Sequence, residues 1–261
     1  MNAEGERIIC VRRRTSASPI LPEWIMKIMN DAANLRRRAA ERAVEFVQSG
    51  MVLGLGTGST TAYAIDLIGE RVQAGALRGI VAVPTSEWTA ARAQALAIPL
   101  TTLIEHPILD LAIDGADEVD PDLNLIKGLG GALLREKIVE IAARRFVVVV
   151  DASKLVERLG TRGPLPVEVT RFAWEAHARW LESLGCRAEL CREADGTPFV
   201  TDNGNTIIHC TFPGGIPDPA ALARTLVERP GILEHGLFLG MATDVVVSGK
   251  DGVRVITRGE S

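Results

Sequence analysis

Between residues 50 and 151, short apolar runs alternate with longer stretches of helical periodicity, and no other feature of the sequence constrains the fold as strongly. The apolar runs predict strands over residues 51–55, 80–83, 109–113 and 146–150. The stretches between them predict helices over residues 59–73, 87–96 and 133–144. Strands that alternate with helices form parallel sheets, so we expect an α/β fold with a Rossmann-like, mostly parallel sheet and helices on both faces.

An amphipathic helix precedes this alternation. Apolar side chains recur every four residues from Leu35 to Val47 among arginines, as on the buried face of a helix. We expect this helix to begin at Asn30 or Asp31 and to end at Gly50. Residues 1–29 lack this periodicity, and we assign them no function. We expect either a disordered extension or a translation start placed too early in the sequence.

The order of elements changes after residue 163. Strands are predicted over residues 167–170, 187–190, 206–212 and 232–238, with helices over residues 172–184 and 219–228. This β-α-β-β-α-β order is typical of a split βαβ, ferredoxin-like unit. Two last strands, over residues 244–248 and 253–257, flank an Asp-Gly turn and are expected to return to the first sheet. We therefore expect a catalytic α/β domain of residues 30–163 plus 240–261, and a small α+β domain of residues 164–239.

Composition and charge exclude several function classes. The 29 basic residues against 33 acidic ones give a net charge of -4, which argues against general attraction to nucleic acid. No apolar run approaches the roughly 18 residues of a membrane span. The four cysteines form no C-x-x-C pair, and reduced thiols in a cytoplasmic protein are the favoured interpretation.

A glycine-rich loop follows the first predicted strand, in the segment Gly54-Leu55-Gly56-Thr57-Gly58-Ser59-Thr60-Thr61. Because a helix is expected next, free N–H groups and the helix dipole can hold a phosphate there, although the glycines also suit a tight turn. Thr85 and Ser86 end the second strand in the same way, as anion ligands or as a simple helix cap.

The acidic segment Asp114-Gly115-Ala116-Asp117-Glu118 follows the strand over residues 109–113. Its carboxylates should emerge at the carboxyl edge of the sheet, where open α/β sheets bind ligands. Its spacing does not fit a calcium loop, which requires a glycine at the sixth position. Asp and Gly are also common turn residues, so a structural role stays open.

A third glycine-rich segment places a cation and a carboxylate around a loop. Lys127 precedes Gly128-Leu129-Gly130-Gly131, and Glu136 lies within the first turns of the next predicted helix. There the helix dipole should keep Glu136 ionised and available as a base, or Glu136 is merely a favourable first-turn charge. Lys154, after the strand over residues 146–150, is either a site cation or a solvated lysine.

The four histidines, at positions 106, 177, 209 and 235, show no spacing typical of metal ligands, and we predict no metal site. The chemistry is therefore expected to rest on carboxylates and lysine.

Taken together, the three glycine-rich and acidic segments resemble the ordered motifs of the ribose-5-phosphate isomerase A family. Four further blocks in the same order extend the resemblance from about residue 30 to the C-terminus: Arg135-Glu136-Lys137, Asp151-Ala152-Ser153-Lys154, Pro164-Leu165-Pro166-Val167-Glu168-Val169 and Thr201-Asp202-Asn203-Gly204-Asn205. Leu129 stands where many members have Gly, and Pro84 where Ser is frequent.

The resemblance implies interconversion of D-ribose 5-phosphate and D-ribulose 5-phosphate, in the non-oxidative pentose phosphate pathway, without metal or organic cofactor. It implies that Glu136 moves the proton through an enediolate, that Asp114 shuttles protons between oxygens with Asp117 nearby, and that Lys127 stabilises the negative charge. It also implies a homodimer or homotetramer. Beside these four residues, the candidate substrate-binding residues are Thr57, Gly58, Ser59, Thr60, Thr85, Ser86, Gly115, Ala116, Gly128, Leu129, Gly130 and Lys154.

Two other functions remain open at this point. The same anion loops would suit a sugar-phosphate sensor, although residues 1–28 are too short and aperiodic for a DNA-binding output module. A lactonase, or a transferase carrying acyl groups on a glutamate, would keep catalysis but change its chemistry.

Overall fold

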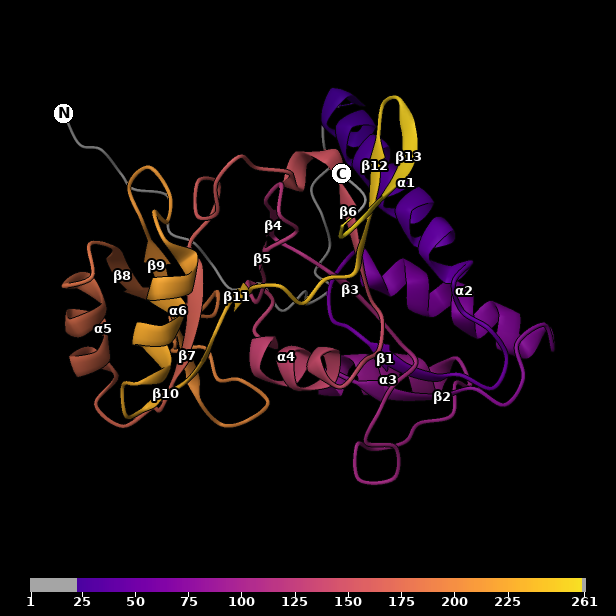
Figure 1. Ribbon diagram of the computed structural model, residues 1–261, viewed down its shortest axis with the longest axis horizontal. Helices are drawn as coiled ribbons and strands as arrows, with labels where there is room; N and C mark the ends of the chain where they lie inside the picture. The colour runs from indigo at the N-terminus through magenta and orange to yellow at the C-terminus, as the bar shows by residue number, and fades with distance from the viewer. Residues whose placement is uncertain (1–22, 260–261) are drawn as a thin grey trace.

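A computed structural model describes residues 23–259 of the chain, and its centre is a six-stranded sheet in the order β13-β12-β6-β3-β1-β2 (Figure 1). The strands are β1 (Val52–Leu55), β2 (Val81–Pro84), β3 (Leu111–Gly115), β6 (Phe146–Asp151), β12 (Asp244–Gly249) and β13 (Gly252–Thr257). Neighbours run parallel except for the β12–β13 hairpin at the edge. The expected mostly parallel sheet is confirmed, with the last two strands paired into it.

Both faces of this sheet are covered, which explains why its strands are almost continuously apolar. Val147 and Val149 of β6 face α1 (Glu23–Val44), α2 (Thr61–Gln73) and α3 (Glu87–Ala95). Val148 and Val150 face the opposite side, where they pack against a three-stranded sheet of β4 (Glu118–Val119), β5 (Leu125–Ile126) and β11 (Leu237–Phe238). The helix α4 (Leu133–Ile141) packs on this second side through Val139.

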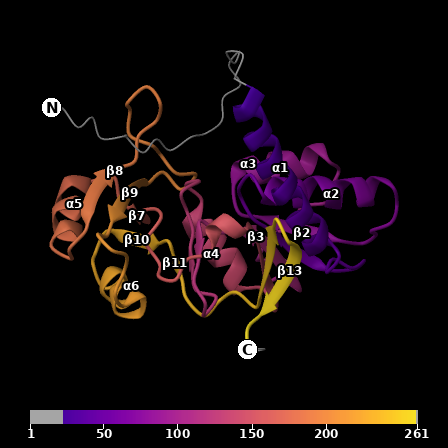
Figure 2. The ribbon, with the colours of Figure 1, turned by 90° about the horizontal axis from the view of Figure 1, so that it is seen from above.

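The segment from residue 165 to 235 forms a separate antiparallel sheet in the order β10-β7-β9-β8. Its elements are β7 (Leu165–Val169), α5 (Trp174–Glu182), β8 (Arg187–Leu190), β9 (Thr206–Thr211), α6 (Pro219–Val227) and β10 (Ile232–His235). The helices α5 and α6 cover one face through Leu181 and Leu226. The expected split βαβ arrangement is confirmed, and two views place α4 between it and the large sheet (Figures 1 and 2).

The three-stranded sheet was not expected, and it breaks the predicted strand over residues 232–238 into β10 and β11. The break falls at Gly236, whose N–H donates to the Pro166 carbonyl while its own carbonyl accepts from Lys127 N–H. A Cβ at this position would lie 2.2 Å from the Lys127 carbonyl oxygen, so only glycine lets the chain cross between the two sheets.

The opening helix also differs from the prediction. It begins at Glu23 rather than at Asn30 or Asp31, and it ends at Val44, short of Gly50. No glycine or proline interrupts residues 23–44, so nothing in the backbone stops the helix from extending upstream past those two possible caps. The predicted extension lies largely outside the described residues.

The cysteines correct one expectation. Cys186 and Cys210 are buried free thiols, as expected, but Cys191 is disulfide-bonded, so the expectation of reduced thiols is wrong for this residue. Whether two cysteines can bond depends on how the fold places them, which their spacing along the chain does not show. Between Glu23 and Gly259, no helix is long and apolar enough to cross a membrane.

Candidate active site

The site forms where the order of the parallel sheet reverses, because β1 has β2 on one side and β3 on the other. The loop after β1 and the end of β3 meet there: Thr57 N–H donates to Asp114 Oδ1 at 3.0 Å. A Cβ on Gly56 would lie 1.9 Å from Asp114 Cγ. The glycine is therefore needed for the loop to close on the carboxylate.

Lys127 is the centre of a buried ionic cluster. Its ammonium Nζ donates to Asp114 Oδ2 and to the Gly115 carbonyl, both at 2.7 Å. It also lies 3.4 Å from Glu136 Oε2 and 3.3 Å from Glu140 Oε1. The lysine side chain is 2% exposed and those of the three acids 4% or less. One cation therefore serves three carboxylates away from solvent.

Asp114 is fixed by donors from three segments. Besides Lys127 and the Thr57 N–H, its Oδ1 accepts from Thr61 Oγ1 at 3.0 Å and from Gly115 N–H at 2.7 Å. Each of these groups donates to the carboxylate, and such charge-assisted bonds are about twice as strong as neutral ones. The Asp114 side chain is thus held rigidly beside the Lys127 ammonium.

The two glutamates of α4 are poor acids in this setting. Burial raises the pKa of Glu136 to about 8; Lys127 opposes the rise, and the Asp114 and Asp117 carboxylates add to it. Burial likewise raises the pKa of Glu140 well above its usual range. The expectation that the helix dipole keeps Glu136 ionised is therefore wrong, because burial next to other acids outweighs a dipole effect of about 1 kcal/mol.

Lys127 remains a cation in the same cluster. Burial by itself lowers its pKa, but the carboxylates of Asp114, Glu136 and Glu140 hold that pKa well above the ordinary value. A permanent positive charge in a site closed to solvent is suited to stabilising a developing negative charge.

Of the other residues in the acidic segment, Asp117 lies near the ionic cluster, whereas Ala116 and Glu118 have structural roles. Burial raises the pKa of Asp117, while the Leu129 N–H bond to its Oδ2, at 3.1 Å, and the charges of Lys154 and Lys127 lower it. Ala116 packs against the core beneath the three-stranded sheet. Glu118 leaves the site: its carboxylate accepts from three backbone N–H groups in the loop at residues 160–163.

A group of hydroxyls supports the first glycine loop. Thr57 Oγ1 lies 2.7 Å from Thr85 Oγ1 and 2.8 Å from Ser86 Oγ. Ser86 also caps α3, accepting from the Thr89 N–H, and Thr89 donates to the Gly56 carbonyl. Thr85 and Ser86 are buried, and they bind the loop rather than face solvent.

The outward part of the same loop suits an anion. Ser59 is exposed, and Gly58, with φ at +149°, has open space where a Cβ would stand. Thr60 caps α2 without a side-chain hydrogen bond. The first N–H groups of a helix have no intrahelical partner, so this terminus offers donors to a phosphate.

A second glycine-rich loop, at residues 128–131, follows Lys127. Its two turn glycines, Gly128 and Gly131, have φ values of +103° and +84°, and Gly131 N–H closes the turn on the Gly128 carbonyl. Gly130 is exposed at the tip. Lys154, half-buried in a 3₁₀ turn after β6, is close enough to lower the pKa of Asp117.

Comparisons with known proteins agree with this geometry. Residues 81–252 match the family model described as ribose 5-phosphate isomerase A (phosphoriboisomerase A). A ribose-5-phosphate isomerase A of Roseiflexus castenholzii is 56% identical over 218 residues, covering 84% of this chain and 93% of the relative. The chain belongs to the ribose-5-phosphate isomerase A family. The resemblance seen in the sequence motifs, and with it the prediction of an isomerase, is confirmed.

Other members of the ribose-5-phosphate isomerase A family extend the match. A probable chloroplastic ribose-5-phosphate isomerase of Arabidopsis thaliana is 50% identical over 250 residues, covering 94% of this chain and 90% of the relative. A solved D-ribose-5-phosphate isomerase in complex with phospho-erythronic acid superposes with a TM-score of 0.85 at 43% identity. It covers 87% of this chain and 99% of its own. The fold class expected from the sequence is thereby confirmed.

Within this family fold, sequence reasoning missed Glu140, and it included Thr61 in the glycine-rich segment without assigning it a role. Glu140 lies one helical turn after Glu136, so the spacing that puts both on one helix face was a usable signal. Thr61 is the first residue of α2, and only the fold shows that its hydroxyl reaches Asp114.

Proposed function

We propose that the chain interconverts D-ribose 5-phosphate and D-ribulose 5-phosphate by carboxylate-mediated proton transfer through an enediolate. The observation that supports this most directly is Glu136, a buried carboxylate with a pKa near 8, beside the Lys127 ammonium. A base is most effective when its pKa lies near the operating pH, and such catalysis is worth about 10² to 10⁴ in rate.

In the proposed reaction, ionised Glu136 removes the proton from C2 of the open-chain aldose and returns it to C1. The enediolate formed between these steps carries negative charge on oxygen. Lys127, fixed by Asp114 and the Gly115 carbonyl, supplies the positive charge that stabilises it. Asp114, with Asp117 nearby, would carry the proton between the two oxygens.

The substrate phosphate is proposed to bind at the outer loops. Gly58, Ser59 and Thr60 offer helix N-terminal donors, while Lys154 and the loop at residues 128–130 provide a charge and further backbone donors. Thr57, Thr85 and Ser86 would act mainly by holding this loop in place. The related structure in complex with phospho-erythronic acid binds a phosphorylated sugar acid, which supports a sugar phosphate as ligand.

The remaining proposals concern context. The reaction needs no metal or organic cofactor, because the substrate carbonyl acidifies the proton that moves. We keep the division into a catalytic domain of residues 30–163 plus 240–261 and a small domain of residues 164–239. We also keep the assignments to a homodimer or homotetramer, to the pentose phosphate pathway and to the cytoplasm, although one relative is named as chloroplastic.

The test is conversion of ribose 5-phosphate to ribulose 5-phosphate by chelator-treated enzyme, with the Glu136→Gln variant in parallel. Wild-type turnover that collapses in this variant, with substrate binding retained by calorimetry, is the expected result. Glu182→Gln, an exposed carboxylate on α5, is the matched control. Binding without turnover in the wild type would favour the sensor, and hydrolysis of a sugar lactone would favour the lactonase.

A further inference from the structure

The loop at residues 201–205 of the small domain is hydrogen-bonded to Arg135, the residue before the proposed base Glu136. Arg135 precedes Glu136 on α4, and its Nε donates to Asn203 Oδ1 at 2.9 Å, while its Nη2 donates to the Asp202 carbonyl at 3.1 Å. Asp202 also accepts, through Oδ2, from the N–H of Glu87 at the start of α3 at 2.9 Å. The loop at residues 201–205 therefore joins the small domain to two helices of the large one.

The loop is itself anchored on a buried carboxylate. Glu168 of β7 is fully buried, and its Oε1 accepts from Thr201 Oγ1 at 2.9 Å, Asn203 Nδ2 at 3.2 Å and Asn205 Nδ2 at 2.9 Å. Gly204, with φ at +79°, completes the turn as its N–H donates to the Thr201 carbonyl. Glu168 thus fixes three of the five loop residues at one point.

Stability alone does not explain this anchor. The other oxygen of Glu168, Oε2, is buried and has no hydrogen-bond partner among residues 23–259. A buried polar atom left unpaired lowers the stability of the folded state, so an apolar side chain at this position would fold more favourably. Such an arrangement is expected where a residue serves function rather than packing.

Asn203 connects the anchor to the site. Its side-chain Nδ2 donates to Glu168, and its side-chain Oδ1 accepts from Arg135. These bonds make a continuous hydrogen-bonded path from β7 to the residue that precedes Glu136. Apolar packing runs beside this path, where Leu133 of α4 meets Phe199 and Ile207 of the small domain. The first turn of α4 is therefore held from the small domain by both polar and apolar contacts.

We propose that Glu168 and Asn203 are positioning residues, which lock the loop at residues 201–205 so that it holds α4 with the Glu136 carboxylate aligned on the reacting carbons. This inference rests on the proposed isomerase reaction. A base displaced by about 1 Å can lose roughly 10²-fold in rate, so a small shift of α4 would suffice.

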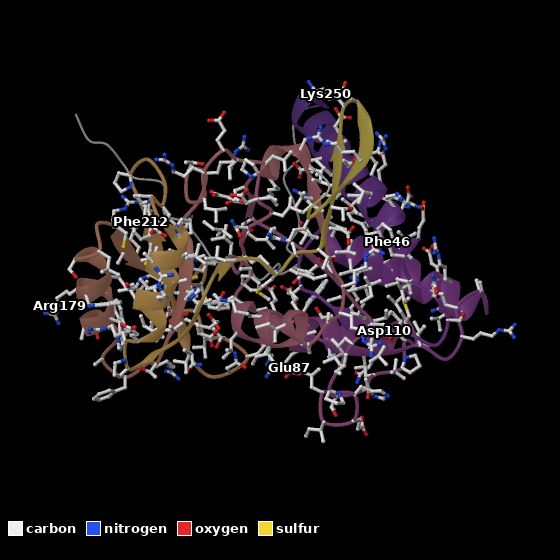
Figure 3. All side chains as sticks on the ribbon, in the orientation of Figure 1. Phe46, Glu87, Asp110, Arg179, Phe212 and Lys250 are labelled. Atoms are coloured by element: carbon white, nitrogen blue, oxygen red, sulfur yellow. The ribbon has the colours of Figure 1, made fainter. Side chains whose placement is uncertain are left out.

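The test compares Asn203→Ala with Glu87→Ala. Glu87, labelled in Figure 3, binds the same guanidinium at 2.7 Å, but its side chain is 71% exposed, and exposed ion pairs contribute little to stability. We expect Asn203→Ala to lower kcat about 10- to 100-fold, to leave KM and the affinity for a phosphorylated sugar acid within about threefold, and to shift the pH profile of kcat/KM. Glu87→Ala should behave like wild type.

A rescue variant separates hydrogen bonding from bulk structure. Glu168→Gln keeps an acceptor oxygen and should retain most of the turnover, whereas Glu168→Ala should match Asn203→Ala. If Asn203→Ala lowered only the melting temperature, with kcat per folded enzyme unchanged, the loop would be merely structural. A raised KM with unchanged kcat would make it a binding element. Either result overturns the proposal.

Hydrogen exchange gives a readout independent of turnover. Amides of α4, residues 133–141, should exchange faster in Asn203→Ala than in wild type or Glu87→Ala. Faster exchange confined to residues 201–205 would overturn the proposal even for an active enzyme. If wild type showed no isomerase turnover, the proposed function would fail, and the exchange of α4 would still decide whether the loop holds the helix.

Discussion

Replacing Glu136 by glutamine should make the protein more stable while making it inactive, and the gain should depend on pH. Glutamine has the shape of a protonated glutamate and cannot ionise. In the folded protein burial raises the pKa of Glu136 to about 8, whereas the ordinary value is 4.5. Between these two values the folded state keeps a proton that the unfolded state releases, so wild-type stability falls as pH rises through this window.

The size of the effect follows from the displacement of the pKa. Each pKa unit corresponds to about 1.4 kcal/mol, so the full difference between variant and wild type is about 5 kcal/mol above pH 8. It shrinks to about 3 kcal/mol at pH 7 and vanishes below about pH 4. For a chain of this size, 3 kcal/mol raises the melting temperature by roughly 6–12 °C.

The assay is thermal or urea unfolding of both proteins at pH 5, 7 and 8.5, with turnover measured on the same samples. Glu140 titrates in both proteins, but the Glu136 charge helps to raise its pKa, so the difference reports Glu136 together with this coupling. Glu182→Gln on the exposed face of α5 should show no pH-dependent gain. A variant less stable than wild type at pH 8.5, or a difference that stays constant from pH 5 to 8.5, would refute the assignment of Glu136 as a buried acid with a raised pKa.

Three further predictions test the same cluster. Because Glu136 must be ionised to act as a base, kcat/KM should rise about tenfold per pH unit up to a plateau near pH 8. A stopped assay that gave a flat pH profile of kcat/KM from pH 6 to 9 would contradict the mechanism. Lys127→Ala should lower kcat and raise KM, and it should destabilise the fold by about 3–5 kcal/mol in urea unfolding, because three buried acids lose their counter-charge. Unchanged kinetics would show that Lys127 does not belong to the site. Gly56→Ala would force a Cβ to within 1.9 Å of Asp114 Cγ, so we expect at least about tenfold loss of kcat with a lower melting temperature, and wild-type behaviour would show that the loop can shift freely.

The central sheet was predictable because its strands are buried on both faces. A run such as Phe146–Val150 needs no tertiary information to be identified as a strand, and the structure places it within one residue of the prediction. Two of the candidate segments could likewise be assigned to one sheet edge, since they follow the parallel strands β1 and β3. Lys127 instead follows β5 of the antiparallel three-stranded sheet, so the sequence could propose it beside Asp114 and Glu136 only through the family resemblance.

The features that were missed depend on contacts between distant segments. Strands of two residues, such as β4 and β11, have too few side chains to show a period of two. Glu140 was a visible neighbour of Glu136 on the helix, but its burial and its distance of 3.3 Å from the Lys127 ammonium depend on how distant segments pack together. The ionisation of Glu136 was misjudged for the same reason: the helix dipole is local, whereas burial comes from the whole fold.

The net charge of the buried cluster affects the activation free energy of the proposed reaction. Asp114, Glu136 and Glu140 surround one ammonium group, and full ionisation would leave two excess negative charges in a closed site. The raised pKa values of Glu136 and Glu140 avoid this, because at least one proton is retained. When ionised Glu136 takes the proton from carbon, the negative charge passes to the enediolate rather than being newly created. The Lys127 ammonium faces that charge before and after the transfer, so little reorganisation is needed at the moment of reaction.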